Sequence, residues 1–344
     1  MAYILTNVGM LENDCAPIPP RLPEIVMEFE QIAFAHQPGI RIGFFFSVFA
    51  LVAIWEVVAP RRARMVSKTK RWFANLGLIA LNTLLLRLLF PLAATGVAAF
   101  GAVHGWGLLN HFHVPFWLAV PAAVIAMDLA IWLQHVMLHA VPALWRLHRV
   151  HHADLDYDVT TGARFHPIEI VLSMLIKFAA ITVIGAPVLA VLIFEVLLNA
   201  TAMFSHGNVR LPRGLDAALR WIVVTPDMHR VHHSIEDDET NSNFGFNLPW
   251  WDRLFGTYRA QPRAGHDGMT IGIRGHADPR EVARLGGMLW LPFKGEVDGY
   301  AINRRAWRGK HAARWRLRHR PPGPRRQARD AQCSGRGSSI HMGS

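Results

Sequence analysis

Four long apolar stretches limit what this chain can fold into. They cover residues 42–59, 72–100, 114–133 and 168–198. A helix needs about 20 apolar residues to cross a bilayer, and a spanning segment must satisfy its own peptide groups because no water reaches them. The stretches therefore predict an all-α integral membrane protein with about three to four transmembrane helices.

The fourth stretch differs from the others because a helix breaker interrupts it. Residues 185–187 read Gly-Ala-Pro, and a proline in a helix interior removes a hydrogen bond and clashes with the preceding turn. We expect two half-length helices that form a re-entrant helical hairpin rather than one span.

Eight histidines fall into three tight clusters. On a helix, positions i, i+3 and i+4 share one face, so each cluster presents two or three imidazoles in one direction. Neutral imidazole binds iron, zinc, copper and nickel. Eight ligands exceed the need of one ion, so the pattern predicts two metal ions. The first cluster is His135 and His139, the second is His148, His151 and His152, and the third is His229, His232 and His233.

Other interpretations of the clusters are weaker. A zinc-protease motif carries Glu between its histidines as the base, whereas Val, Met and Leu separate His135 from His139. A non-catalytic metal-binding or transport protein predicts histidines at several membrane depths, whereas these clusters lie outside the apolar stretches. A lone histidine is more often a packing residue, but a repeated pattern argues against that interpretation here.

The distribution of basic residues predicts the orientation. Six Lys or Arg residues lie between positions 61 and 71, and residues 101–113 contain none. Loops rich in Lys and Arg stay in the cytoplasm. We therefore expect a cytoplasmic helical cap that carries the three histidine clusters, with the C-terminal tail on the same side.

Charge separates the C-terminal tail from the rest of the chain. Residues 304–344 contain 12 Lys or Arg and one acid, so the tail alone supplies the net charge of +11. We expect it to be disordered, and either to adhere to anionic lipid headgroups or to remain solvated, with no specific nucleic-acid partner. The predicted division is an N-terminal segment 1–40, a membrane domain 41–260, a C-terminal extension 261–303 and the basic tail 304–344.

Arg87, Asp128 and Lys177 are among the charged residues inside the apolar stretches, where charge is costly and usually functional or paired. Asp128 precedes His135 by seven positions, about two turns along one helical face. It could therefore orient a metal ligand through a hydrogen bond. The alternative is a structural pair between Arg87 and Asp128. We expect the ammonium group of Lys177 to reach toward the membrane surface.

These motifs together resemble the fatty acid hydroxylase/sterol desaturase superfamily, which makes residues 41–260 a membrane hydroxylase or desaturase domain. The resemblance covers roughly residues 40–260. The strings that carry it are LWRLHRVHH at 144–152, VTTGARFHPIE at 159–169, FSHGN at 204–208, TPDMHRVHHS at 225–234, and NFG, WD and FGTY between 243 and 258.

The resemblance implies roles for individual residues. The eight cluster histidines are the expected metal ligands, and His206 is the expected ninth, because the superfamily has a histidine in this intermediate position. His166 either binds metal or holds Glu169 or a water, while Arg164 shapes the same loop. The possible outer residues around the ligands are Asp128, Arg164, His166, Glu169 and Asn208.

The resemblance also implies a non-haem di-iron centre, in which zinc can replace iron. It uses O2 and two electrons to oxidise a C–H bond of a membrane lipid, by hydroxylation or desaturation of a fatty acyl chain, a sterol or a related lipid. The sequence has neither a dinucleotide fingerprint nor a cysteine set for an iron–sulfur centre. Electrons are therefore expected from a separate ferredoxin or cytochrome with its reductase. The close alternative is an ether-lipid monooxygenase that uses a pterin.

Overall fold

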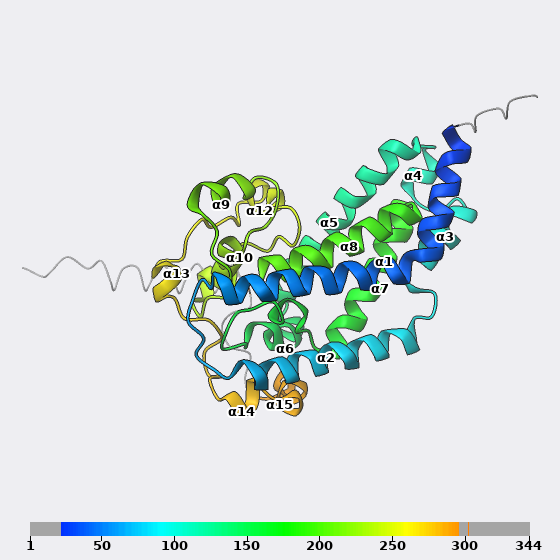
Figure 1. Ribbon diagram of the computed structural model, residues 1–344. Coiled ribbons are helices and arrows are strands. Elements are labelled where there is room, and N and C mark those ends of the chain that lie inside the picture. The colour runs from blue at the N-terminus through cyan, green and yellow to red at the C-terminus, as the bar shows by residue number, and fades with distance from the viewer. Residues whose placement is uncertain (1–21, 296–301, 303–344) are drawn as a thin grey trace, which may run out of the picture. The chain divides into compact units, whose positions relative to one another are not determined.

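The computed structural model describes residues 22–295 and residue 302 (Figure 1). In this part of the chain the regular elements are all helical, and β-structure is limited to two isolated bridges, so the all-α prediction is confirmed there. The predicted basic tail lies outside the described residues. The helices are α1 Leu22–Val58, α2 Lys68–Leu89, α3 Ala93–Val103, α4 Leu108–His111, α5 Phe116–Ala140, α6 Pro142–His152, η1 Thr161–Ala163, α7 Pro167–Ile184, α8 Val188–Ser205, α9 Arg213–Leu219, α10 Pro226–His232, α11 Asp237–Thr240, α12 Trp250–Leu254, α13 Gly265–Gly268, α14 Pro279–Val282, α15 Leu285–Trp290 and η2 Leu291–Phe293.

Five helical segments of the described chain are long and apolar enough to cross a membrane. They are Glu30–Val58, Lys68–His111, Phe116–Ala140, Pro167–Ile184 and Val188–Ser205. Many of their large apolar side chains are exposed, as expected for a surface in contact with lipid. The number exceeds the predicted three to four spans because the two helices of the fourth apolar stretch each qualify.

The second apolar stretch does not form one helix. α2 ends at Leu89, and α3 begins at Ala93 after a turn that contains Pro91. The proline has no N–H to continue the helix, and its ring clashes with the preceding turn. α3 packs against α7 and α8.

The fourth stretch breaks where the sequence predicts it. α7 is followed by Gly185 in the left-handed conformation at φ 74°, which terminates the helix. A Cβ at Gly185 would lie 2.7 Å from the carbonyl oxygen of Trp106, so this turn requires glycine. α7 and α8 have 18 residues each, about 27 Å, so they are not half-length. Their arrangement as a re-entrant hairpin stays a prediction.

α8 lies at the centre of the helix packing, beside α1, α3 and α5 (Figure 1). Where α3, α5 and α8 meet, the buried residues include Ala94, Ala98, Ala123 and Ala190. Small side chains let membrane helices approach closely. This packing brings the C-terminal ends of α5 and α8 into one region, which we call the histidine end of the molecule.

Candidate metal centre

The first two histidine clusters lie on helices joined by a tight turn. α5 ends at Ala140 and α6 begins at Pro142, where proline costs no hydrogen bond because the first N–H groups of a helix have no partner within it. The first cluster occupies the last turns of α5, and the second occupies the last turns of α6. The turn between these helices therefore brings the two clusters together.

The third cluster lies on the short helix α10. Thr225 caps this helix by accepting a hydrogen bond from the backbone N–H of Met228 at 3.3 Å, and Pro226 occupies its first turn. His229 and His232 belong to α10, and His233 directly follows it.

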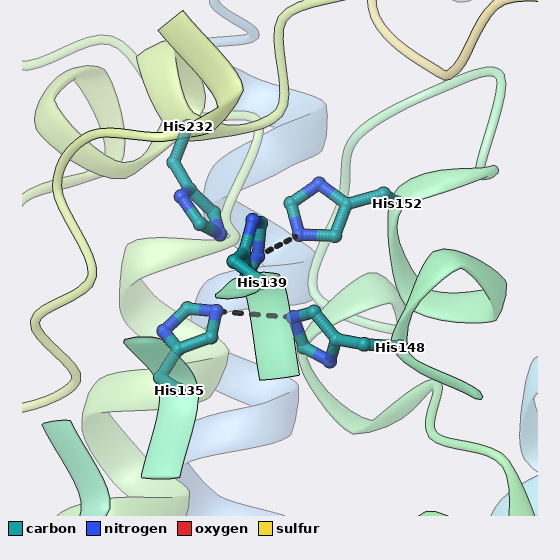
Figure 2. Close-up of side chains that lie close together, drawn as sticks. All are labelled: His135, His139, His148, His152 and His232. Atoms are coloured by element: carbon teal, nitrogen blue, oxygen red, sulfur yellow. Dashed lines mark hydrogen bonds between the residues drawn. The ribbon is translucent and has the colours of Figure 1, made fainter. Parts of the chain in front are cut away.

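The structure sorts the eight cluster histidines and His206 into two buried groups. In each group, the ligand atoms lie within 4.8 Å of one another, which is compact enough to hold a metal ion. Figure 2 shows the five rings of the larger group, which converge from α5, α6 and α10. The five-histidine group is His135, His139, His148, His152 and His232, and the four-histidine group is His151, His206, His229 and His233.

The division does not follow the sequence clusters. The second cluster supplies His148 and His152 to the five-histidine group and His151 to the four-histidine group. The third cluster is divided in the same way, since His232 joins one group and His233 the other. The sequence predicts two ions but does not assign the ligands between them.

Hydrogen bonds fix the tautomer of several imidazoles. A ring whose Nδ1 faces a carbonyl, amide or carboxylate oxygen donates its proton there, so its Nε2 keeps the lone pair that a metal needs. The Nδ1 contacts are His135 to the Phe244 carbonyl at 2.8 Å, His139 to Asn241 Oδ1 at 3.1 Å, His148 to Glu169 Oε1 at 2.7 Å, His206 to the Ala202 carbonyl at 2.7 Å and His232 to the Ser242 carbonyl at 2.7 Å.

The Nε2 atoms show that these rings fit a cation. Those of His135 and His148 lie 3.0 Å apart although both carry lone pairs, an arrangement that is repulsive unless a cation lies between them. Two nitrogens bound to one ion at about 2.1 Å and at a right angle are about 3 Å apart. The other close Nε2 pairs are His139 with His152 at 3.2 Å, His151 with His206 at 3.2 Å and His206 with His229 at 3.1 Å.

Unpaired nitrogen atoms support the same conclusion. The Nε2 atom of His232 and both ring nitrogens of His233 are buried without a hydrogen-bond partner. Buried polar atoms are normally paired, so such atoms require an explanation. A bound metal ion supplies one for the Nε2 atoms.

Burial keeps the imidazoles neutral. It lowers the pKa of His148 to about 3 and that of His206 to about 3. A histidine that is neutral at physiological pH is in its metal-binding form. Burial, reinforced by neighbouring imidazoles, also lowers the pKa well below its ordinary value for His151, His152, His229, His232 and His233.

Glu169 lies against the five-histidine group. It is buried in the first turn of α7, and its Oε1 accepts the hydrogen bond from His148 Nδ1. Its other oxygen, Oε2, has no hydrogen-bond partner. A carboxylate in this position orients a ligand ring and increases its basicity.

Asp128 is buried but takes neither of the roles weighed from the sequence. Its Oδ2 accepts hydrogen bonds from the Trp251 indole at 2.8 Å and from the Leu248 backbone at 3.3 Å. Arg87 is exposed and forms no pair with it. Asp128 therefore ties α5 to α12 and to the loop that precedes it, instead of contacting a cluster histidine.

The remaining predicted outer residues support the backbone near the groups. Arg164 donates to the Val150 carbonyl, inside the second cluster, at 2.8 Å. His166 caps α7 by accepting from the backbone N–H of Ile168 at 3.2 Å, and it lies in neither histidine group. Asn208 joins the segment after His206 to the backbone carbonyl of Arg62 at 2.9 Å.

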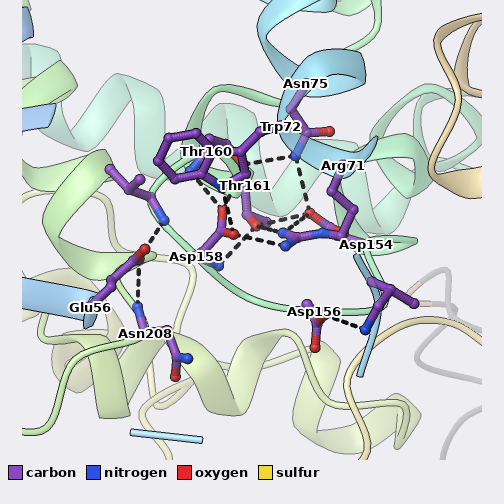
Figure 3. A network of polar contacts seen from close by, with 12 residues as sticks. Glu56, Arg71, Trp72, Asn75, Asp154, Asp156, Asp158, Thr160, Thr161 and Asn208 are labelled. Carbon is purple, nitrogen blue, oxygen red and sulfur yellow. Dashed lines mark hydrogen bonds and ion pairs between the residues drawn. The ribbon is translucent and has the colours of Figure 1, made fainter. Parts of the chain in front are cut away.

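A buried polar network holds the loop that follows the second cluster (Figure 3). Arg71, from α2, contacts Asp154 through Nε at 2.7 Å and Asp158 through Nη1 at 2.7 Å. Burial alone would raise the pKa of Asp154, but Arg71 and Arg164 hold it well below its usual value. This loop therefore depends on buried charge pairs.

Glu56 joins this loop to the segment that follows His206 of the four-histidine group. Its Oε1 accepts from the backbone N–H of Val159 at 2.7 Å and from that of Asn208 at 2.9 Å (Figure 3). No partner of Glu56 or Arg71 could be predicted from the sequence. The only sequence signal was the run of acids at 154, 156 and 158 directly after a histidine cluster.

A cavity of about 670 Å³ leads to the five-histidine group. It is lined mainly by apolar residues of α1, α2, α5, α7 and α8, which include Phe45, Ile79 and Met203. His148 is the one member of the two groups that lines it, and Glu169 lies beside it in the wall. The cavity can therefore hold an apolar molecule with one end at the histidines.

The fold and the site define a helical protein with five candidate membrane spans and two buried histidine groups, each able to hold a metal ion. Residues 120–257 match the fatty acid hydroxylase family, and this segment contains all nine histidines. Over this segment the chain is thus similar to the oxidoreductases of the fatty acid hydroxylase family, as the motifs predict.

The chain is also similar to two kinds of curated protein. Ornithine lipid hydroxylase OlsE of Rhizobium tropici is 26% identical over 70% of this chain and 73% of its own length. Alkylglycerol monooxygenase of Xenopus tropicalis is 27% identical over 54% of this chain and 41% of its own length, and the Homo sapiens protein is 27% identical over 41% and 30%. The chain thus spans less than half of the alkylglycerol monooxygenases. No solved structure matches the chain.

Proposed function

We propose that this protein hydroxylates a C–H bond of a membrane lipid with O2 at a di-iron centre. The observation that carries the proposal is the pair of buried histidine groups, one of which opens on an apolar cavity. The two groups adjoin each other, since the rings of His152 and His233 stack with centroids 4.6 Å apart. The match of residues 120–257 to the fatty acid hydroxylase family supports a lipid as the class of substrate.

The five-histidine group would hold one iron ion and the four-histidine group the other. Bound iron supplies the reduction of O2 and the oxidation of the C–H bond. The balanced reaction takes the lipid, O2, two electrons and two protons to the alcohol and water. Nitrogen-rich ligation distinguishes this centre from the glutamate-rich di-iron sites of soluble helix bundles.

The residues of the chain position the reactants. The cavity walls hold the acyl body and exclude water from the reacting carbon. Glu169 keeps the Nδ1 proton of His148 in place and so keeps its Nε2 available to metal. The network around Arg71 fixes the loop beside the second cluster. We further propose that the histidine end faces the cytoplasm, where a ferredoxin or cytochrome with its reductase delivers the electrons.

Hydroxylation is favoured over desaturation by the relatives, whose names specify a hydroxylase and monooxygenases. A second candidate function is ether-lipid oxidation with electrons from a pterin, supported by the similarity to alkylglycerol monooxygenase. Supplying purified enzyme with a reduced pterin or with a reduced ferredoxin separates these two candidates by which donor supports turnover.

The proposal is tested by metal analysis and lipid turnover. Purified protein should contain about two iron ions per chain after iron loading, and a strain that expresses it should accumulate hydroxylated lipid. His151→Ala and His232→Ala, one from each group, should abolish the product. His111→Ala is the matched control, because His111 is exposed and lies outside both groups. Product formation by either cluster variant would exclude the proposed ligand roles.

A further inference from the structure

Three charged side chains meet in the cavity wall away from the histidines. Glu195 of α8 contacts Arg41 of α1 through Oε2 at 2.6 Å and Lys177 of α7 through Oε1 at 2.9 Å. All three line the cavity. Lys177 thus points inward, which corrects the expectation that its ammonium group reaches the membrane surface.

This set of charges is unbalanced. Two cations share one carboxylate, and Arg87, a further cation, also lines the cavity. The other acid in the wall, Glu169, is engaged with His148. Arg41 Nε is buried without a hydrogen-bond partner. One ion pair would be enough to join two helices, and an additional cation at membrane depth is costly unless an anion accompanies it.

The charged set lies well away from the histidine end. Lys177 follows Glu169 by eight positions on α7, about 12 Å along a helix. Glu195 precedes Ser205, the last residue of α8, by ten positions, about 15 Å. Both helices therefore place the charges at one end of the cavity and His148 at the other.

We propose that Arg41 and Lys177 bind an anionic oxygen group of the lipid, a carboxylate or a phosphate, while Glu195 holds the two cations in place. Arginine and lysine are the usual partners of both anions. The inference rests on the proposed lipid oxidation and adds the substrate class, an anionic lipid. It also predicts that the hydroxylated carbon lies well along the acyl chain from the anionic group.

Direct binding tests the inference without turnover. The full-length, iron-loaded protein in detergent is mixed with tritiated palmitate, palmitic acid methyl ester or dipalmitoyl phosphatidic acid, and binding is measured by scintillation proximity. The ester has the same chain without the charge. Unmodified protein should bind at least one anionic probe about tenfold more tightly than the ester, as expected for a charge-assisted hydrogen bond. The preferred anion identifies carboxylate or phosphate.

Substitutions test the assignment to these residues. Arg41→Gln and Lys177→Gln should remove the preference for the anion and leave ester binding unchanged, whereas Lys177→Arg should retain it. Glu195→Gln should tighten binding of the anionic probe, because it removes the competing carboxylate; a merely structural role predicts weaker binding of every probe. Lys70→Gln removes a charge from an exposed site on α2 and is the control.

Equal affinity of the unmodified protein for acid, ester and phosphatidic acid would overturn the inference, and so would an anion preference that persists in both Arg41→Gln and Lys177→Gln. The iron content and turnover of the same preparations report separately on the proposed function. Loss of the anion preference with two irons still bound would therefore leave the di-iron centre in place.

Discussion

Both histidine groups are buried and compact, but their surroundings differ. The five-histidine group includes two rings from the candidate membrane span α5 and reaches the cavity through His148. The four-histidine group contributes no ring to the cavity wall and lies against Tyr157, whose ring is 5.0 Å from His233 between centroids. The comparison indicates that the first group faces the apolar cavity, whereas the second lies away from it, on α6, α10 and the residues that follow α8 and α10.

The largest expected effect comes from two adjacent residues that serve different groups. His232→Ala removes a proposed ligand from the five-histidine group, and His233→Ala removes one from the four-histidine group. Each variant should lose one of two irons and lower turnover by more than about 100-fold, because even residues behind the ligands give 10- to 100-fold effects. Iron analysis with Mössbauer spectroscopy should show that each variant loses a different iron. Loss of the same iron in both variants would contradict the assignment of His232 and His233 to different metal ions.

Acid should affect both groups alike. The pKa of His148 and that of His206, one from each group, are both lowered to about 3 by burial. Unfolding restores them to about 6.5, so the unfolded chain binds more protons. Metal-free protein should therefore be most stable above about pH 6.5 and lose stability steadily as pH falls toward 3. Denaturant unfolding in detergent at several pH values measures this; constant stability from pH 7 to 4 would contradict it.

Arg71→Met should test the support of the loop after the second cluster. The substitution leaves Asp154 and Asp158 buried without their main partner, which costs about 3–5 kcal/mol of folding stability. Tyr157 belongs to the same loop, so iron should leave the four-histidine group first. Lys70→Met changes the exposed neighbour and should be almost neutral. Equal unfolding midpoints for the two variants would show that the network does not stabilise the fold.

Glu169→Gln should affect the five-histidine group alone. The substitution replaces one of the two carboxyl oxygens that can face His148 Nδ1 with an NH2 group, which weakens the hold on that ring. We therefore expect turnover to fall about 10- to 100-fold with two irons still present in iron-saturated protein. Glu195→Gln is a matched change in the same cavity wall and should leave the iron spectra unaltered. An unchanged iron spectrum in Glu169→Gln would show that Glu169 does not orient His148 as a metal ligand.

Tyr157→Phe is the smallest expected effect. It deletes the hydroxyl that donates to the Ser205 carbonyl at 2.6 Å and leaves the ring against the four-histidine group. The expected cost is about 1 kcal/mol of folding stability. The affinity for the second iron should fall slightly while the first is unaffected, as measured by iron titration. A larger fall in iron affinity at the five-histidine group would contradict the conclusion that Tyr157 supports the four-histidine group.

Several features could be predicted from local pattern. The helix break at Gly185 depends on residue types that stop a helix in any context, and the structure has it there. The break at Pro91, which separates α2 from α3, has the same physical cause but was not predicted. Apolar residues continue on both sides of it, so hydropathy gives no sign that the helix ends there. Lys177 shows the same limit, since its partner Glu195 comes from another helix.

The sequence by itself determined the helical membrane class and the histidine clusters, because hydropathy and helical periodicity act over a few turns. Only the tertiary structure decided which imidazole belongs to which group, since adjacent residues such as His151 and His152 point to different centres. It also decided the partners of Arg71 and Glu195, which come from helices distant in the chain. A buried charge takes its partner from whatever the packing brings within a few ångströms, and sequence spacing does not encode that distance.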